Sequence, residues 1–109
     1  MRKGKVYNND VLAGTISQLD DGRYMFLYED AYYNSSLPAI SLTLPKSQQQ
    51  FLSNVLFPFF FNMLSEGSNK KLQSRLLKID EEDHFGFLLK TTAHETIGAV
   101  RIEEVTDND

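Results

Sequence analysis

An apolar segment that begins at Phe51 and ends before Gly67 constrains the fold of this chain more than any other stretch. Its large apolar residues come in adjacent pairs that return every four positions, which is the spacing of a wide apolar stripe on an α-helix. A fully buried side chain of this size contributes about 1.5–3 kcal/mol. We therefore expect the segment to form the centre of the core, through Phe51, Leu52, Val55, Leu56, Phe59, Phe60, Met63 and Leu64.

Two features limit the helix in this segment. Pro58 has no amide proton and disfavours helical geometry at Phe57. The regular helix is therefore expected to begin at Pro58, after a separate turn or a kinked first segment over 53–57. Turn-forming residues occupy 65–69, where Gly67 can adopt the left-handed conformation that closes a helix, and a second helix is expected to follow this corner.

The residues before this segment favour strands. Asn8-Asn9-Asp10 reads as a hairpin turn, because Asn and Asp tolerate positive φ. Asp20-Asp21-Gly22 is a second turn signal, and residues 23–28 form an aromatic strand whose two faces are both apolar. This suggests a sheet that is covered or curls on itself. We expect 29–36 to be irregular and 39–44 to be a short strand that Pro45 ends.

The C-terminal third is expected to hold a third helix and a last strand. Asp80 is the predicted cap of that helix, which carries Phe85, Leu88 and Leu89. Residues 97–102 alternate as a strand, and the acidic tail 103–109 is expected to fray. The predicted fold class is α+β: a small antiparallel, barrel-like sheet with three helices packed on it, the last strand returning to the sheet. Residues 1–109 are predicted to be one domain.

Composition excludes several classes of function. The net charge of −4 argues against nucleic acid as the main partner, because phosphate binding needs concentrated Lys and Arg. The absence of cysteine excludes disulfides and thiolate metal sites. No stretch has the length of apolar residues that a membrane helix needs, and no signal-peptide core follows the basic start. We therefore expect a cytoplasmic protein that does not bind membranes.

The sequence offers no convincing catalytic motif. His84 and His94 lie beside acidic residues, but no third ligand stands at a known spacing, so both are interpreted as surface residues of a short helix. The glycines lack the spacing of a phosphate-binding loop. The serines have no histidine at a motif spacing, so nucleophilic catalysis is not expected. We predict a protein that is not an enzyme and has no catalytic, cofactor or metal site.

Four blocks of the sequence, taken together, resemble one known family. Residues 58–67, Pro-Phe-Phe-Phe-Asn-Met-Leu-Ser-Glu-Gly, are similar to the Phe-Phe-Asp/Glu-Asn-Leu-Leu-Pro-Glu/Asp signature of the N-terminal subdomain of HipA-type serine/threonine kinases, which are toxins of toxin–antitoxin systems. Three more blocks match the family's motifs in order and spacing: Asn8-Asn9 with Gly14, Ser41-Leu42-Thr43-Leu44-Pro45, and Gly98-Ala99-Val100. Phe61 replaces an acid of the signature, and Ser65 replaces its proline.

The resemblance implies a non-catalytic role, because the family's catalytic residues belong to a larger C-terminal kinase core. We expect a stand-alone, HipS-like component of a three-gene system. Its partners would be a HipA/HipT-like kinase chain and, in the same complex, a HipB-like helix-turn-helix protein. The chain would control the kinase, by neutralising it or alternatively by completing or scaffolding it. The other hypotheses are a protein-binding domain without a kinase partner and a small enzyme or nucleic-acid binder with an unrecognised site.

The predicted partner-binding surface is the corner after the organising helix and the exposed side of that helix. Phe61 is either extra core or an exposed anchor, and large aromatic residues on a rigid helix end are effective interface anchors. The corner has small polar side chains held between two helix ends, so a partner could bind it at little ordering cost. The predicted residues are Phe61, Asn62, Ser65, Glu66, Gly67, Ser68 and Asn69.

Overall fold

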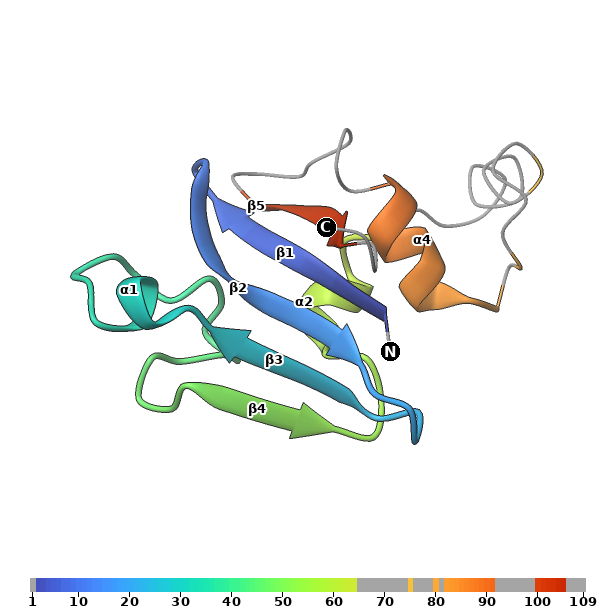
Figure 1. Cartoon of the computed structure of the whole chain (residues 1–109), viewed down its shortest axis with the longest axis horizontal. Coiled ribbons are helices and arrows are strands. Elements are labelled where there is room, and N and C mark those ends of the chain that lie inside the picture. The colour runs from blue at the N-terminus through green and yellow to red at the C-terminus, as the bar shows by residue number, and fades with distance from the viewer. Residues whose placement is uncertain (1, 65–74, 76–79, 81, 92–99, 106–109) are drawn as a thin grey trace.

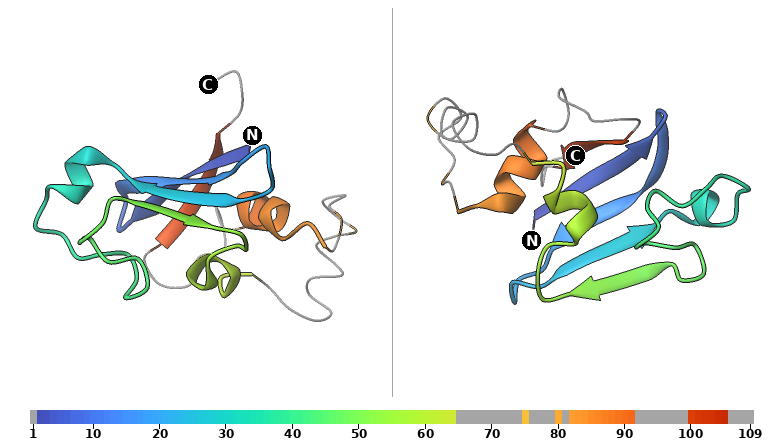
Figure 2. Two further views of the ribbon diagram at one scale, coloured as in Figure 1. Left: turned by 90° about the horizontal axis from the view of Figure 1, so that it is seen from below. Right: turned by 180° about the vertical axis from the view of Figure 1, so that it is seen from behind.

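The fold consists of a five-stranded antiparallel sheet with α2 and α4 on one face of it and α1 beyond one end of the strands (Figures 1 and 2). This computed structural model describes residues 2–64, 75, 80, 82–91 and 100–105. The strands are β1 (Arg2–Asn8), β2 (Val11–Gln18), β3 (Tyr24–Tyr28), β4 (Gln50–Ser53) and β5 (Val100–Val105). The helices are α1 (Asp30–Tyr33), α2 (Pro58–Phe61) and α4 (His84–Thr91).

The strand order is β4-β3-β2-β1-β5, so the first and last strands of the chain lie side by side. Val6 is opposite Ile102 in this pairing, and both side chains are fully buried. The sheet is strongly twisted, and β5 crosses the direction of β4 steeply in the left view of Figure 2. The predicted α+β class and the return of the last strand to the sheet are confirmed.

Two turns and one helix start that the local sequence predicted are present in the structure. Asn9 and Asp10 have φ of 51° and 66°, and together they form the two-residue hairpin turn between β1 and β2. Gly22 has a φ of 90° in the next turn. Helix α2 begins at Pro58, whose missing N–H is tolerated in the first helical turn.

The core lies between the inner face of the sheet and helices α2 and α4 (Figure 2). Phe60 is fully buried, and its ring lies 5.7 Å from that of Phe26 on β3. Phe85, Leu88 and Leu89 of α4 are buried, as the sequence predicted. Gly4 of β1 allows this helix to approach, because a Cβ there would lie 2.7 Å from Leu89 Cδ2. Any side chain at this position would force the Leu89 and Ile102 side chains to shift.

The first part of the organising segment is a strand instead of a helix. Residues 50–53 pair with β3, and the side chain of Phe51 faces the core while 51% of Leu52 is exposed. Helix α2 is correspondingly short, with Asn62 at its C-cap. The expectation that Phe51 and Leu52 belong to a helical apolar stripe was wrong, because pairing with β3 imposes an alternation of two. The predicted closure at Gly67 and the second helix lie outside the described residues.

Four further expectations were wrong. Residues 30–33 form α1, within the stretch expected to be irregular, and 39–44 contain turns instead of a strand. The cap of α4 is Asp83, whose Oδ1 accepts a hydrogen bond from the Gly86 N–H at 3.1 Å, whereas Asp80 caps the turn before it. Residues 103–105 continue β5. Of the two alternatives for the apolar strand over 23–28, a sheet covered on both faces does not hold, because Leu27 on the outer face of β3 is 38% exposed.

Candidate functional site

The exposed part of α2 combines one large apolar side chain with a polar helix end. Phe61 is 43% exposed, and its ring meets the ring of His84 on α4 edge-on at 5.1 Å. Asn62 is exposed at the C-cap, where its backbone N–H bonds to the Pro58 carbonyl at 2.9 Å. Phe61 is therefore a partly exposed residue on a rigid element and not extra core.

A small hollow lies beside this helix end. It has a volume of about 210 Å³ and is lined by Phe59, Asn62, Met63 and Val100. Three of its four lining residues are apolar, and Val100 brings in the start of β5. We call the exposed Phe61 and Asn62 together with this hollow the α2 surface. Of the predicted partner-binding residues, Phe61 and Asn62 lie on it, and Ser65 to Asn69 lie outside the described residues.

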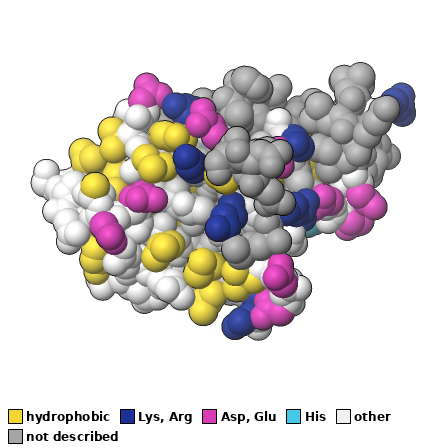
Figure 3. Space-filling view, viewed as in Figure 1, with side chains coloured by type: hydrophobic (Ala, Val, Ile, Leu, Met, Phe, Trp, Pro, Cys, Tyr) yellow, Lys and Arg dark blue, Asp and Glu magenta, His cyan; other side chains and the backbone are white. Residues whose placement is uncertain are grey.

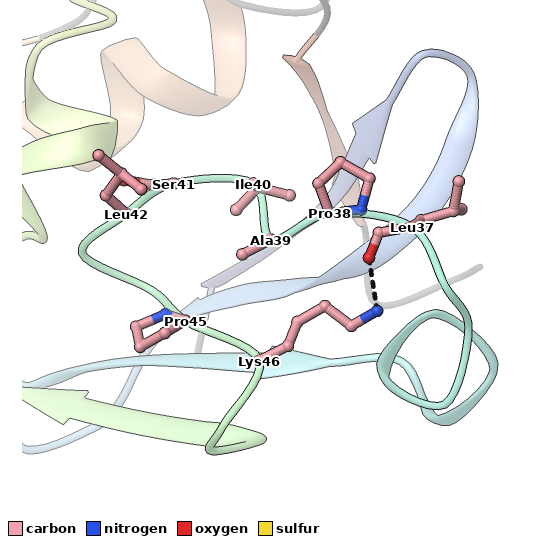
Figure 4. A pocket seen from close by; sticks show the side chains of 8 residues that line it. All are labelled: Leu37, Pro38, Ala39, Ile40, Ser41, Leu42, Pro45 and Lys46. Carbon is pink, nitrogen blue, oxygen red and sulfur yellow. Dashed lines mark hydrogen bonds between the residues drawn. The ribbon is translucent and has the colours of Figure 1, made fainter.

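The loop between α1 and β4 forms a second exposed apolar surface (Figure 4). An open hollow of about 620 Å³ is lined by Leu37, Pro38, Ala39, Ile40, Ser41, Leu42, Pro45 and Lys46. Leu42 is 99% exposed and Leu37 is 41% exposed, whereas Ile40 is buried. We call this surface the loop hollow.

Two stacked tyrosines connect the loop hollow to the sheet through hydrogen bonds. The rings of Tyr28 and Tyr32 are 5.9 Å apart and nearly parallel. The hydroxyl of Tyr28 donates to the Leu44 carbonyl and accepts from the Ile40 N–H at 3.2 Å. Burial raises the pKa of Tyr28, so this hydroxyl stays protonated and remains a donor. The hydroxyl of Tyr32 donates to the Pro38 carbonyl at 2.7 Å.

Lys46 closes the other side of the loop. Its ammonium donates to the carbonyls of Ser35 at 2.8 Å and Leu37 at 2.7 Å, the second of which is drawn in Figure 4. It also lies 5.2 Å from the centre of the Tyr32 ring. Hydrogen bonds from Tyr28, Tyr32 and Lys46 therefore hold the loop on which Leu42 is exposed.

Sequence reasoning missed Leu42 as a surface residue. Alternation over 39–44 predicted a strand with Ile40, Leu42 and Leu44 on one face. In the structure Ser41 accepts hydrogen bonds from Leu44 through its carbonyl and from the Thr43 N–H through its hydroxyl. This turn sends Leu44 into the core and Leu42 into solvent. The Ser-x-Thr spacing, which favours side-chain turns, was the available signal.

The described residues bring together no group of three His, Asp or Glu side chains that could hold a metal ion. No described helix has the length and apolarity that crossing a membrane requires. His84 packs on Phe61, while His94 lies outside the part of the chain that the structure describes.

A family model and a solved structure both match this chain to the HipA N-terminal domain. The HipA N-terminal domain family matches residues 4–103. A solved structure described as the N-terminal domain of HipA toxin superimposes with a TM-score of 0.74 at 30% identity, covering 98% of this chain and 95% of that one. An uncharacterized protein of Haemophilus influenzae is 35% identical over 104 residues, which are 95% of this chain and 93% of the relative.

Proposed function

Because the chain belongs to the HipA N-terminal domain family, we propose that it is a non-catalytic binding subunit of a split HipA-like toxin–antitoxin system. In this proposal it binds a separate HipA/HipT-like kinase chain in the cytoplasm and neutralises it. The observation that carries the proposal is the pair of exposed apolar surfaces on ordered elements, next to a sequence without kinase motifs.

The α2 surface is the proposed main contact with the kinase. Phe61 presents an aromatic ring that needs little ordering, because the ring already packs on His84. The hollow beside it can take one apolar side chain of the partner. The corner 65–69 begins three residues after Asn62 in the sequence, and we propose that Ser65, Glu66, Gly67, Ser68 and Asn69 complete the surface.

Leu42 of the loop hollow is the proposed second contact. Leu42 is 99% exposed and Leu37 is 41% exposed on the same loop, and together they form an apolar patch of the kind that partners cover in interfaces. Substituting Leu42 should leave stability unchanged, because its side chain contacts little of the fold. A change in affinity on substitution would therefore report binding directly.

The proposed subunit does not contact DNA itself. Its net charge of −4 opposes binding to phosphate, so a HipB-like helix-turn-helix protein would provide the DNA contact of the complex. A kinase assay distinguishes neutralisation of the kinase from completion of the kinase. In the first case added chain lowers kinase autophosphorylation, and in the second it raises it.

The test is a pull-down of a HipA/HipT-like kinase chain with this chain, combined with a kinase assay. We expect Phe61→Asp, Glu66→Lys and Leu42→Asp each to weaken binding. Val11→Asp is the matched control, because Val11 and Phe61 are equally exposed at 43% but Val11 lies on β2. Each variant is first shown to fold by circular dichroism.

Three outcomes would contradict parts of the proposal. Absence of binding by the wild-type chain would remove the kinase-binding function. Unchanged binding by Phe61→Asp and Glu66→Lys would remove the α2 surface from the interface. Unchanged binding by Leu42→Asp would remove the loop hollow.

A further inference from the structure

Strand β4 forms one edge of the sheet, and none of the described strands pairs with its outer side (Figure 1). Natural sheets protect such edges with charged residues, proline or bulges, because an unpaired edge recruits other strands. The β4 edge has neither charged residues nor proline. No charged residue stands between Lys46 and Glu66, and no proline stands between Pro45 and Pro58. The ammonium of Lys46, the nearest charged group before the strand, donates to the Ser35 and Leu37 carbonyls and therefore does not protect the edge.

The register of β4 decides which of its backbone groups face outward. The Tyr28 N–H donates to the Gln49 carbonyl at 3.0 Å, and the pairs Phe26–Phe51 and Tyr24–Ser53 follow in register. In an antiparallel pair, alternate residues turn their backbone groups toward the neighbouring strand. The N–H and C=O of Leu52 therefore point away from β3. The Gln50 carbonyl also lies on the outer side, where it accepts from Gln48 Nε2 at 2.6 Å.

Apolar side chains accompany this free edge on the outer face of the sheet. Leu52 is 51% exposed and lies directly opposite Met25. Leu27, two residues after Met25 on the same face of β3, is 38% exposed. Figure 3, which views this face, shows hydrophobic side chains gathered over β3 and β4. Leu52 thus offers both an apolar side chain and a pair of backbone groups that bond to none of the described strands.

We infer that the β4 edge pairs with β4 of a second copy of this chain, forming a two-fold antiparallel dimer centred on Leu52. A two-fold axis perpendicular to the sheet places residues of the same face opposite each other, so Leu52 meets Leu52 of the second copy. Each Leu52 N–H then donates to the other Leu52 carbonyl, which is the pairing that the outward groups require. On the outer face, Met25 and Leu52 of both copies form one apolar ladder.

A second copy fits this edge because the edge is complementary to itself. Residues 47–57 carry no charge, so antiparallel pairing of two copies brings no like charges together. The same two-fold operation pairs Gln50 with Asn54, both of which are uncharged and polar. The inference does not depend on the proposed kinase-binding function, since the α2 surface and the loop hollow lie on other elements.

The test measures self-association of the full chain. Sedimentation equilibrium from micromolar to millimolar concentration should show the weight-average mass rising from 12.5 kDa toward twice that value. Leu52→Lys should weaken self-association by more than about tenfold, because two lysines would face each other across the pair. Leu42→Lys is the matched control, because it exposes the same charge on the loop hollow and should leave the mass unchanged.

Backbone hydrogen exchange locates the contact. The Leu52 amide should become protected as concentration rises, whereas the exchange of the Phe51 amide, which faces β3, should stay constant. A wild-type chain that remains monomeric at millimolar concentration would overturn the inference. So would a dimer that Leu52→Lys leaves intact, or a monomer whose Leu52 amide becomes protected only when the kinase chain is added.

Discussion

Phe60 occupies the centre of an aromatic cluster that joins α2 to the sheet. Its ring lies 5.7 Å from Phe26, 6.3 Å from Phe57 and 5.2 Å from Phe59, and the residue is fully buried. We expect Phe60→Ala to lower the free energy of unfolding by about 3–5 kcal/mol, because the cavity is surrounded by rings that cannot all move into it.

Urea denaturation measures this loss, and Phe61→Ala is the control. Phe61 is adjacent in sequence but 43% exposed, so its truncation should lower the free energy of unfolding much less. Equal losses for the two variants would show that the core does not centre on Phe60.

Tyr28 is the residue that ties the loop hollow to β3. Its buried hydroxyl bonds to the Leu44 carbonyl and the Ile40 N–H. Tyr28→Phe leaves both groups without this partner and should cost about 1–3 kcal/mol.

Denaturation and hydrogen exchange test this prediction together. The Ile40 amide should lose protection in Tyr28→Phe. Tyr33→Phe serves as the control, because the Tyr33 side chain packs on the core but no hydrogen bond of its hydroxyl joins it to the described residues. Full protection of Ile40 in Tyr28→Phe would mean that the loop is held by other contacts.

At the scale of elements, Arg2 and Asp83 connect the first strand to α4. Two guanidinium nitrogens donate to the two carboxylate oxygens of Asp83 at 2.9 and 2.8 Å. The Arg2 guanidinium also lies 5.3 Å from the centre of the Phe85 ring. The hydrogen bond from Arg2 lowers the pKa of Asp83, with a smaller contribution from the Gly86 N–H.

The lowered pKa predicts how this connection depends on pH. A carboxyl whose folded pKa is below its unfolded value stabilises the fold above the unfolded pKa, and the contribution is lost as pH falls through the folded pKa. Asp83→Asn keeps a good helix cap but removes the charge. It should cost at most about 1 kcal/mol near neutral pH, since both side chains are partly exposed to solvent.

Thermal unfolding at decreasing pH checks this prediction. The stability difference between the wild type and Asp83→Asn should shrink in acid, whereas Asp83→Ala, which also loses the cap, should remain less stable throughout. A difference between the wild type and Asp83→Asn that is constant with pH would show that the ion pair contributes nothing.

At the scale of the whole molecule, the chain presents several exposed apolar surfaces and no nucleotide-binding motif. The sequence has no glycine-rich loop paired with a lysine, and the described residues gather no metal-binding cluster. We expect no binding or hydrolysis of ATP by the isolated chain, because both require these groups to hold the phosphates and magnesium.

Isothermal titration calorimetry with Mg-ATP tests this expectation, and the separate kinase chain is the positive control. A micromolar, magnesium-dependent site on this chain would contradict the proposed non-catalytic role. It would favour the hypothesis of a small enzyme with an unrecognised site.

The sequence by itself determined the features that depend on local chemistry. Asn9 and Asp10 form the hairpin turn because their short polar side chains tolerate positive φ in any context. Pro58 begins α2 because it lacks an N–H, and the apolar spacing of α4 buries Phe85, Leu88 and Leu89. The family resemblance was likewise visible in short motifs at fixed order, and the match over residues 4–103 confirms it.

Only the tertiary structure decided the outcome where local signals were compatible with two structures. Phe51 and Leu52 fit a helical stripe and also a strand, and the neighbouring β3 selected the strand through its backbone hydrogen bonds. In the same way, alternation over 39–44 fits a strand, but the Tyr28 hydroxyl and the Ser41 turn left Leu42 in solvent. Exposure depends on which elements pack together, and residue spacing alone does not contain that information.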